Sequence, residues 1–229
     1  MRVAVLFSGG KDSTFSTWLT QHQGWDIKAL LTVRPSSAES LMFHHPNVEW
    51  TRLQAEAMDV PRDLVEVRGN NELTDLGKEL ERLRNDEKIS GVVSGAVASD
   101  YQKTRFDNLC ETIGLKTFAP LWHKKPKLLV EDLKQAGYRI ILTAVAAKGL
   151  DGSWLGRELT DTEWLRLERL STTNGINLTG EGGEYESFVL DAPHFKRSIE
   201  ILESHPEWEG DSGRLVIEKA SLRDKLSDG

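Results

Sequence analysis

The sequence contains a single cysteine, Cys110, among 229 residues. One thiol excludes an internal disulfide and any metal site built from several cysteines, and it counts against enzymes that move sulfur between paired cysteines. We therefore expect Cys110 to be a packing residue in a protein of the reducing cytoplasm.

Long hydrophobic runs are also missing. No apolar stretch approaches the roughly 18 residues needed to cross a membrane. The chain runs from Met1 directly into a short apolar strand, with no charged leader and no cleavage site. These absences predict a soluble, cytoplasmic protein that has no contact with a membrane.

Basic residues are too few to balance the acids. The chain has 29 Lys and Arg residues against 36 Asp and Glu, which gives a formal charge of -7. A negative surface repels nucleic acid, so direct nucleic acid binding is not expected. The densest basic stretch, HKKPK at 123–127, is most simply a solvated turn before a helix.

The first half of the sequence alternates short apolar runs with segments of helical period. Apolar runs at 3–7, 26–33, 63–67 and 89–95 predict strands, and the segments between them predict helices, as do Phe106 and Cys110 further on. Strands that alternate with helices favour a doubly wound, mostly parallel sheet covered on both faces. Ligands bind to such sheets beyond the carboxyl ends of the strands.

The second half has a different character. A helix at 127–137 and a strand at 138–147 are followed by Thr160 and Glu163, which have the spacing of a capping box. Strand-like runs then dominate at 186–193, 198–203 and 214–219. We therefore expect a smaller C-terminal α+β lobe, and we divide the chain into a domain at 1–125 and a lobe at 126–229.

The most informative short stretch is SGGKDS, residues 8–13, which lies between the first strand and the first helix. A turn through two glycines can direct several backbone N–H groups at one point, and the following helix adds partial positive charge there. Such a point suits a phosphate group. Lys11 supplies a full positive charge, the neighbouring serines supply hydroxyl donors, and Asp12 can cap the helix or help organise a magnesium ion.

A second stretch of polar residues follows the strand at 89–95. Small residues there, Gly95 and Ala96, permit close approach of an adenine or ribose edge, and polar side chains occupy the start of the next helix. The plainer alternative is a capped and solvated helix start. Since both stretches begin where a strand ends, they should lie on the same edge of the sheet. The candidate nucleotide-binding residues are Ser8, Gly9, Gly10, Lys11, Asp12, Ser13, Gly95, Ala96, Ser99, Asp100, Tyr101, Gln102 and Arg105.

The third stretch is GEGGEYES, residues 180–187. Two adjacent glycines between polar and β-forming residues are typical of a hairpin turn, and this plain interpretation stays open. However, three glutamates gather around one tyrosine, which a solvated turn does not require. Carboxylates and an aromatic face are suited to binding cations, and a carboxylate can accept a proton from one.

Together these stretches resemble a known family. SGGKDS resembles the pyrophosphate-loop signature SGGxDS of enzymes that cut ATP between its α- and β-phosphates. The segments GAVASDYQKTRFDNLC (95–110) and GEGGEYES resemble signatures of the diphthine–ammonia ligase family, and LMFHHPN (41–47) and PLWHK (120–124) are similar to its loops. The matches extend from residue 8 to residue 187. The resemblance implies a sheet of the adenine nucleotide alpha hydrolase-like, HUP type.

The resemblance also implies a reaction. ATP and Mg²⁺ would serve to adenylate the carboxylate of diphthine, a modified histidine of elongation factor 2 that carries a quaternary ammonium group, and ammonium would supply the amide nitrogen. The implied catalytic residues are Lys11, Asp12, Glu181 and Glu184. The implied substrate-binding residues are His44, Asn47, Glu181, Gly182, Gly183, Glu184, Tyr185 and Glu186. The pair of His44 and His45 lacks further ligands at suitable spacing, so no metal site is expected there.

Two other classes of function stay open at this stage. One is a different pyrophosphate-loop ligase or transferase that acts on transfer RNA or a small molecule. The other is a module that binds ATP or AMP without catalysis. The sequence leaves the metal ligands unassigned, and it also leaves open whether the protein forms a homodimer.

Overall fold

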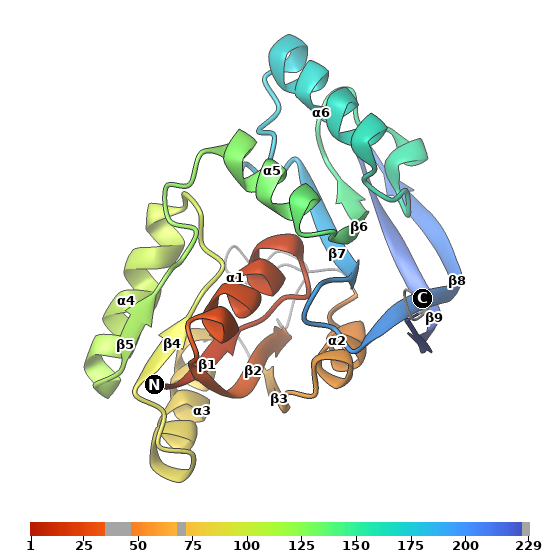
Figure 1. Cartoon of the computed structure of the whole chain (residues 1–229). Helices are drawn as coiled ribbons and strands as arrows, with labels where there is room; N and C mark the ends of the chain where they lie inside the picture. The colour runs from red at the N-terminus through yellow and green to blue at the C-terminus, as the bar shows by residue number, and fades with distance from the viewer. Residues whose placement is uncertain (35–46, 68–71, 226–229) are drawn as a thin grey trace.

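The structure is a computed structural model, and it describes residues 1–34, 47–67 and 72–225, apart from the side chain of Gln102. His44 and the rest of the stretch 35–46 lie outside the described residues. Two sheets, one parallel and one antiparallel, form the framework of the chain (Figure 1).

The first sheet is parallel, with strand order β3-β2-β1-β4-β5. Its strands are β1 (Arg2–Leu6), β2 (Asp26–Arg34), β3 (Arg62–Glu66), β4 (Gly91–Val93) and β5 (Lys116–Phe118). The connecting helices are α1 (Lys11–His22), the short η1 (Val48–Trp50), α2 (Thr51–Met58), α3 (Glu72–Asp86) and α4 (Asp100–Ile113).

Alternation along β1 decides how this sheet is covered. Val3 and Val5 point to the face that packs against α1 and α2, whereas Ala4 points to the face that packs against α3 and α4. Cys110 is fully buried in this second layer, as expected of a packing residue. Helices on both faces confirm the doubly wound parallel architecture. The strand β5 is an element that the sequence did not predict, because three residues are too short for a period-2 pattern to stand out.

The second sheet is antiparallel, with order β7-β6-β9-β8. Its strands are β6 (Arg139–Val145), β7 (Tyr185–Asp191), β8 (Arg197–Glu209) and β9 (Ser212–Asp224), and it is accompanied by α5 (Pro126–Gln135), η2 (Gly152–Trp154) and α6 (Asp161–Asn174). The helix α5 begins within the basic stretch 123–127, as predicted. Thr160 is the N-cap of α6, but its hydroxyl bonds the carboxylate of Glu163 and no backbone amide, so the expected capping box is incomplete.

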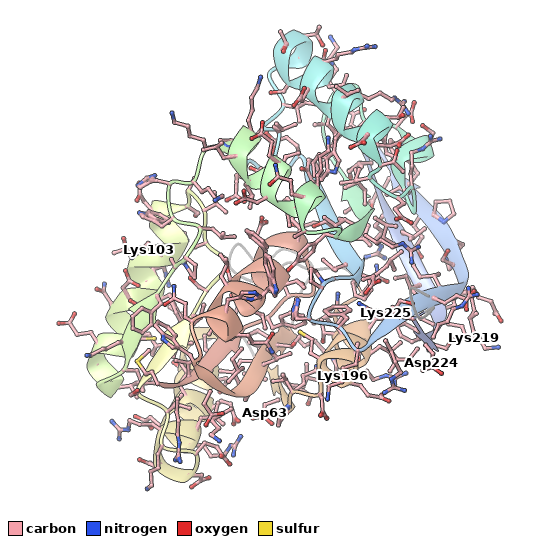
Figure 2. The ribbon with its side chains drawn as sticks, in the orientation of Figure 1. Asp63, Lys103, Lys196, Lys219, Asp224 and Lys225 are labelled. Carbon is pink, nitrogen blue, oxygen red and sulfur yellow. The ribbon has the colours of Figure 1, made fainter. Side chains whose placement is uncertain are left out.

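The two sheets are joined by one continuous hydrophobic core. Phe15 and Leu53 of the first sheet's helices belong to the same buried cluster as Ile140 and Phe188 of the second sheet. Polar contacts reinforce the junction: the indole of Trp50 donates to the Ile217 carbonyl oxygen at 2.9 Å. On the surface, Lys196 pairs with Asp59 at 2.8 Å. Lys196 is one of the side chains labelled in Figure 2. The lobes are therefore held in a fixed relation by both apolar burial and hydrogen bonds.

Candidate active site

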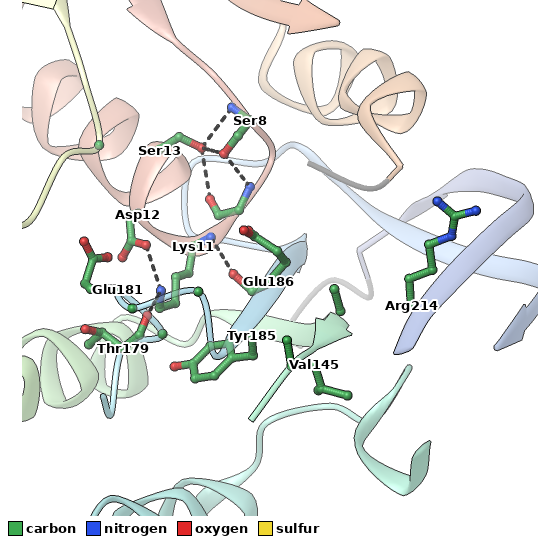
Figure 3. Close-up of a pocket in the computed structure, with 18 of the residues that line it drawn as sticks. Ser8, Lys11, Asp12, Ser13, Val145, Thr179, Glu181, Tyr185, Glu186 and Arg214 are labelled. Atoms are coloured by element: carbon green, nitrogen blue, oxygen red, sulfur yellow. Dashed lines mark hydrogen bonds and ion pairs between the residues drawn. The ribbon is translucent and has the colours of Figure 1, made fainter. Parts of the chain in front are cut away.

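A cavity of about 1070 Å³ lies where the two sheets meet, at the carboxyl ends of β1 and β4 (Figure 3). Because the strand order reverses between these two strands, this is the position at which a doubly wound sheet offers a crevice. One wall comes from residues 8–13, another from residues 94–96, and a third from residues 179–187 of the second lobe. The three stretches singled out in the sequence thus meet in one place.

The phosphate loop, residues 8–13, is shaped by its glycines and serines. Gly9 has a φ of +81°, and Gly10 is the N-cap of α1. The Ser13 hydroxyl accepts from the Ser8 backbone amide at 3.3 Å and lies 3.1 Å from the Ser8 hydroxyl. These contacts tie the start of the loop to the first turn of α1, so the helix N-terminus opens into the cavity.

Gly95 allows the two halves of the candidate nucleotide site to touch. A Cβ at this position would lie 2.7 Å from the Ser13 backbone nitrogen and 2.9 Å from the Asp12 carbonyl carbon. Backbone atoms cannot yield as a flexible side chain can, so only glycine allows this approach. The close approach at Gly95 is to the start of α1, and contact of residues 95 and 96 with an adenine or ribose edge stays a prediction.

Lys11 is the charged centre of the site. Its side chain is only 4% exposed. The ammonium donates to Asp12 Oδ2 at 2.7 Å and to the carbonyl oxygen of Thr179 at 2.5 Å, and it lies 5.5 Å from the centre of the Tyr185 ring. Burial opposes the charged form, but the surrounding Asp12, Tyr185 and Glu181 outweigh it and raise the pKa of Lys11. The cation is therefore permanent at physiological pH.

Two carboxyl groups lie beside this cation, as Figure 3 shows for Asp12 and Glu181. Burial raises the pKa of Asp12, and the ion pair with Lys11 acts in the opposite direction. Burial, together with the nearby Asp12, raises the pKa of Glu181 to about 7. Glu181 therefore has a pKa near neutral pH, which is the property of a group that takes up and releases protons.

Glu184 has a different environment from Glu181. Its two carboxylate oxygens accept hydrogen bonds of 2.8 Å from the backbone amides of Asn177 and Gly182. These bonds fold residues 177–184 into a compact loop, and Glu184 is not among the residues that line the cavity. The alternative of a hairpin turn is not found at these residues, because the glycine pair leads directly from this loop into β7.

The last residues of the same motif line the cavity from β7. Tyr185 is buried, and its hydroxyl donates to the Leu178 carbonyl oxygen at 2.7 Å. The Ser187 hydroxyl accepts from the Lys11 backbone amide at 3.2 Å. Glu186 also lines the cavity. The second lobe therefore contributes to the phosphate loop directly, through β7.

The start of α4 is only partly drawn into the site. Gly95 and Ala96 line the cavity, but Ser99 and Asp100 lie at the helix start outside it. Tyr101 is 52% exposed and receives a 2.8 Å hydrogen bond from Arg105, so these two side chains engage each other on the surface. The side chain of Gln102 lies outside the described residues.

Asn47, expected to contact substrate, holds the lobes together. Its amide nitrogen donates to the Leu215 carbonyl oxygen at 2.7 Å, and its amide oxygen accepts from the Ile217 backbone amide at 2.9 Å. Asn47 is not among the cavity-lining residues.

Several cavity-lining residues were not identified from the sequence. Apart from Ser187, which ends the GEGGEYES stretch, and Thr179, which precedes it, they carry no local motif, since they come from isolated positions in α4 and β9 and around the β8–β9 turn. They are Lys103, Phe106, Thr179, Ser187, Glu207, Trp208, Glu209, Ser212, Gly213 and Arg214. The stretch EWEGDSGR at 207–214 contains a signal that could have indicated a binding site, because a tryptophan among acidic residues is unusual for a plain turn.

A smaller cavity of about 250 Å³ adjoins the large one. It is lined by residues 97–98, 123–126 and Asn177, and it shares Thr179 and Glu181 with the large cavity. Glu181 therefore stands in the wall between two hollows. Within residues 1–34, 47–67 and 72–225, no group of three or more His, Cys, Asp or Glu side chains is arranged to hold a metal ion. No helix in this part of the chain is long and apolar enough to cross a membrane.

In comparisons with known proteins, both halves of the chain match the same protein family. Residues 1–117 match the family model of the diphthamide synthase N-terminal domain, and residues 125–222 match that of the diphthamide synthase C-terminal domain. The chain is 36% identical to the diphthine–ammonia ligase of Mus musculus over 222 residues, covering 88% of this chain and 83% of the mouse protein. It is 33% identical to that of Homo sapiens over 241 residues, covering 96% and 86%. The chain therefore belongs to the diphthamide synthase (diphthine–ammonia ligase) family and is an enzyme of the ligase class.

Proposed function

We propose that this protein converts the carboxylate of diphthine on elongation factor 2 into an amide, using ATP and ammonium and releasing AMP and pyrophosphate. The observation that carries the proposal is the meeting of the phosphate loop with residues 179–187 in one cavity. Lys11 binds both halves, through Asp12 and the Thr179 carbonyl oxygen. A nucleotide and an acceptor bound by these two segments would be close enough to react.

The residues present fit the phosphates of ATP. A Cβ would crowd the backbone or its neighbours at Gly9, Gly10 and Gly95, so the glycines keep a concave backbone surface at the N-terminus of α1. Lys11 uses two of its three N–H donors within the described protein and has a third for a phosphate oxygen. Asp12 Oδ1 is buried and has no hydrogen-bond partner among the described residues, which suits an oxygen that binds Mg²⁺. A magnesium ion bound with the nucleotide would neutralise phosphate charge.

In the first step, a carboxylate oxygen of the acceptor attacks the α-phosphorus of ATP. The bond between that phosphorus and the bridging oxygen breaks, and pyrophosphate leaves with the bonding electrons. Negative charge grows on the leaving group, so the Lys11 ammonium and the N–H groups of the loop stabilise the transition state more than the ground state. The product of this step is an acyl-adenylate.

In the second step, ammonia attacks the acyl carbon and the bond to the AMP oxygen breaks. Ammonium must first lose one proton, and the nitrogen loses a second proton to solvent as the amide forms. Glu181 is the group that fits the first transfer, because its pKa is about 7 and it lies in the wall between the two cavities. Glu184, which binds backbone amides, holds the loop that carries Glu181.

The experiment is mass spectrometry of unamidated elongation factor 2 after incubation with this protein, ATP, Mg²⁺ and ammonium. We expect the mass of the amide on the modified histidine, with AMP and pyrophosphate formed in equal amounts. Omission of ammonium and the Lys11→Ala variant serve as controls. AMP formation that depends on added transfer RNA would instead support a transfer RNA enzyme. ATP recovered unchanged with every acceptor would support a nucleotide-binding module.

A further inference from the structure

The turn between β8 and β9 places side chains in the large cavity, although it is far in sequence from the three motifs. In the β8–β9 hairpin, Trp208 pairs with Gly213, and Gly213 pairs in turn with Val145 of β6. Val145 pairs on its other side with Tyr185, where β7 begins. The turn is therefore aligned with the glutamate motif at one end of the second sheet. Figure 3 shows Arg214, next to this turn, across the cavity from Glu181.

Trp208 is the notable residue of this turn. Its side chain is 47% exposed, yet it lines the cavity. The ring lies over Gly213, where a Cβ would be 2.1 Å from one ring carbon and 2.6 Å from the next. The indole nitrogen donates to the Gly210 carbonyl oxygen at 2.9 Å. Two features thus fix the ring in place: Gly213 has no side chain to push it away, and the indole nitrogen bonds the Gly210 carbonyl oxygen. Much of the ring surface is left uncovered.

Two acidic residues next to Trp208 in the sequence, Glu207 and Glu209, line the same cavity. Glu207 binds Arg214 at 2.6 Å, and this hydrogen-bonded pairing lowers the pKa of Glu207, so it is ionised at neutral pH. Within the described residues, Glu209 forms no ion pair. A cavity that offers both an exposed aromatic face and carboxylates attracts a cation, most strongly one whose methyl groups prevent ordinary hydrogen bonding.

We propose that Trp208, with Glu207 and Glu209, binds the quaternary ammonium group of the acceptor side chain. This inference rests on the proposed function, because diphthine is the acceptor that carries such a group. The cavity has cation-binding chemistry at the hairpin turn and phosphate-binding chemistry at Lys11. An acceptor held by its ammonium group at the turn would present its carboxylate towards the nucleotide. Recognition of the methylated nitrogen would then select the substrate.

The binding test uses choline and its neutral isostere 3,3-dimethylbutan-1-ol, which has the same shape without the charge. In protein with ¹⁵N-labelled tryptophan, the Trp208 indole resonance is identified by its loss in Trp208→Phe. We expect choline to move this resonance and the neutral isostere to leave it in place. Three results would overturn the proposal: equal shifts with both probes, no shift with choline, or a shift that ATP causes and choline does not.

Calorimetry with choline then tests the individual groups. We expect Trp208→Ala to weaken choline binding about tenfold, in line with the strength of a cation–π contact. Gly213→Ala keeps the indole but displaces it, so binding should fall to a similar extent. Glu209→Gln should weaken choline binding several-fold with the hairpin intact. The matched control is Glu87→Gln, at an exposed position directly after α3, which should leave choline binding unchanged. Unchanged affinity in Trp208→Ala and Glu209→Gln would contradict the assignment.

Kinetics separates this inference from the proposed function. If both hold, Glu209→Gln raises the KM for the protein acceptor and leaves the KM for ATP unchanged. If the wild-type protein binds choline through Trp208 but never amidates elongation factor 2, the cation site stands and the proposed function fails. If amidation occurs and choline does not bind, the function stands and the cation site fails.

Discussion

The side-chain amide of Gln54 donates a 2.8 Å hydrogen bond to the carbonyl oxygen of Gly9, in the middle of the phosphate loop. The same nitrogen donates to the Val189 carbonyl oxygen of β7 at 2.9 Å, and Gln54 is completely buried. One side chain in α2 therefore joins the phosphate loop to the second lobe. Gln54 touches no part of the cavity, so its effect on binding acts through the loop.

Removing the Gln54 amide should destabilise the protein and loosen the nucleotide site. Gln54→Leu removes the donor that the Gly9 and Val189 carbonyl oxygens share, and we expect the free energy of unfolding to fall by about 1–3 kcal/mol. Urea unfolding measures this change, and ATP titration measures the accompanying rise in Kd. The exposed Gln135→Ala is the control. A variant with wild-type stability and ATP affinity would show that the link is unimportant.

Gly95→Ala should impair nucleotide binding more than it impairs folding. The added Cβ would lie 2.7 Å from the Ser13 backbone nitrogen, so residues 94–96 would be forced away from the start of α1. We expect ATP affinity to fall at least tenfold, as measured by calorimetry. Gly152→Ala is a suitable control, because a Cβ there has its nearest neighbour at 4.0 Å. Equal ATP affinities in the two variants would contradict the close-approach role of Gly95.

Lys11→Ala and Asp12→Ala should both abolish adenylation while the fold persists. Lys11 neutralises charge on the departing pyrophosphate, and the loss of such a group costs about 10²–10³-fold in rate. Pyrophosphate release in the presence of acceptor is the measurement, with circular dichroism as the check on folding. Wild-type pyrophosphate release by either variant would refute the role assigned to this loop.

The amidation rate should rise with pH through about 7, at a fixed concentration of ammonium ion. The proton-accepting form of Glu181 is the carboxylate, and its share increases as pH passes its pKa of about 7. Glu181→Gln should be slow and should lose this inflection, whereas Glu87→Gln should keep it. A Glu181→Gln profile with the same midpoint would assign the proton transfer to another group.

The same titration has an opposite effect on stability. The pKa of Glu181 is higher in the folded protein than the 4.5 of an ordinary glutamate, so the folded state holds its proton more tightly. Relative to Glu181→Gln, the free energy of unfolding should therefore decrease as pH rises from about 4.5 to about 7, and then stay constant.

Glu184→Gln should behave as a change in loop structure. A carboxamide offers only one acceptor oxygen for the two backbone amides of Asn177 and Gly182. We expect the free energy of unfolding to fall by about 1–3 kcal/mol together with a loss of activity. Thermal unfolding and amidation assays are the two measurements. A normal melting temperature combined with a large loss of kcat would instead make Glu184 a proton carrier.

The sequence by itself determined the parallel sheet and the phosphate loop. Alternation of apolar strands with helices fixes the doubly wound layers, because the faces of β1 must both be covered. The stretch from Ser8 to Ser13 carries its own geometry in two glycines and the helix start. These are local properties, so neighbouring residues in the chain contain the necessary information.

Only the tertiary structure decided which polar side chains act together. Glu181 and Glu184 are equivalent in the motif, yet burial beside Asp12 raises the pKa of one and backbone amides engage the other. Tyr101 and Arg105 had the right spacing for the site but pair with each other on the surface. Trp208 enters the cavity through strand pairing between distant segments. Burial and long-range pairing depend on the whole fold, and no short stretch of sequence encodes them.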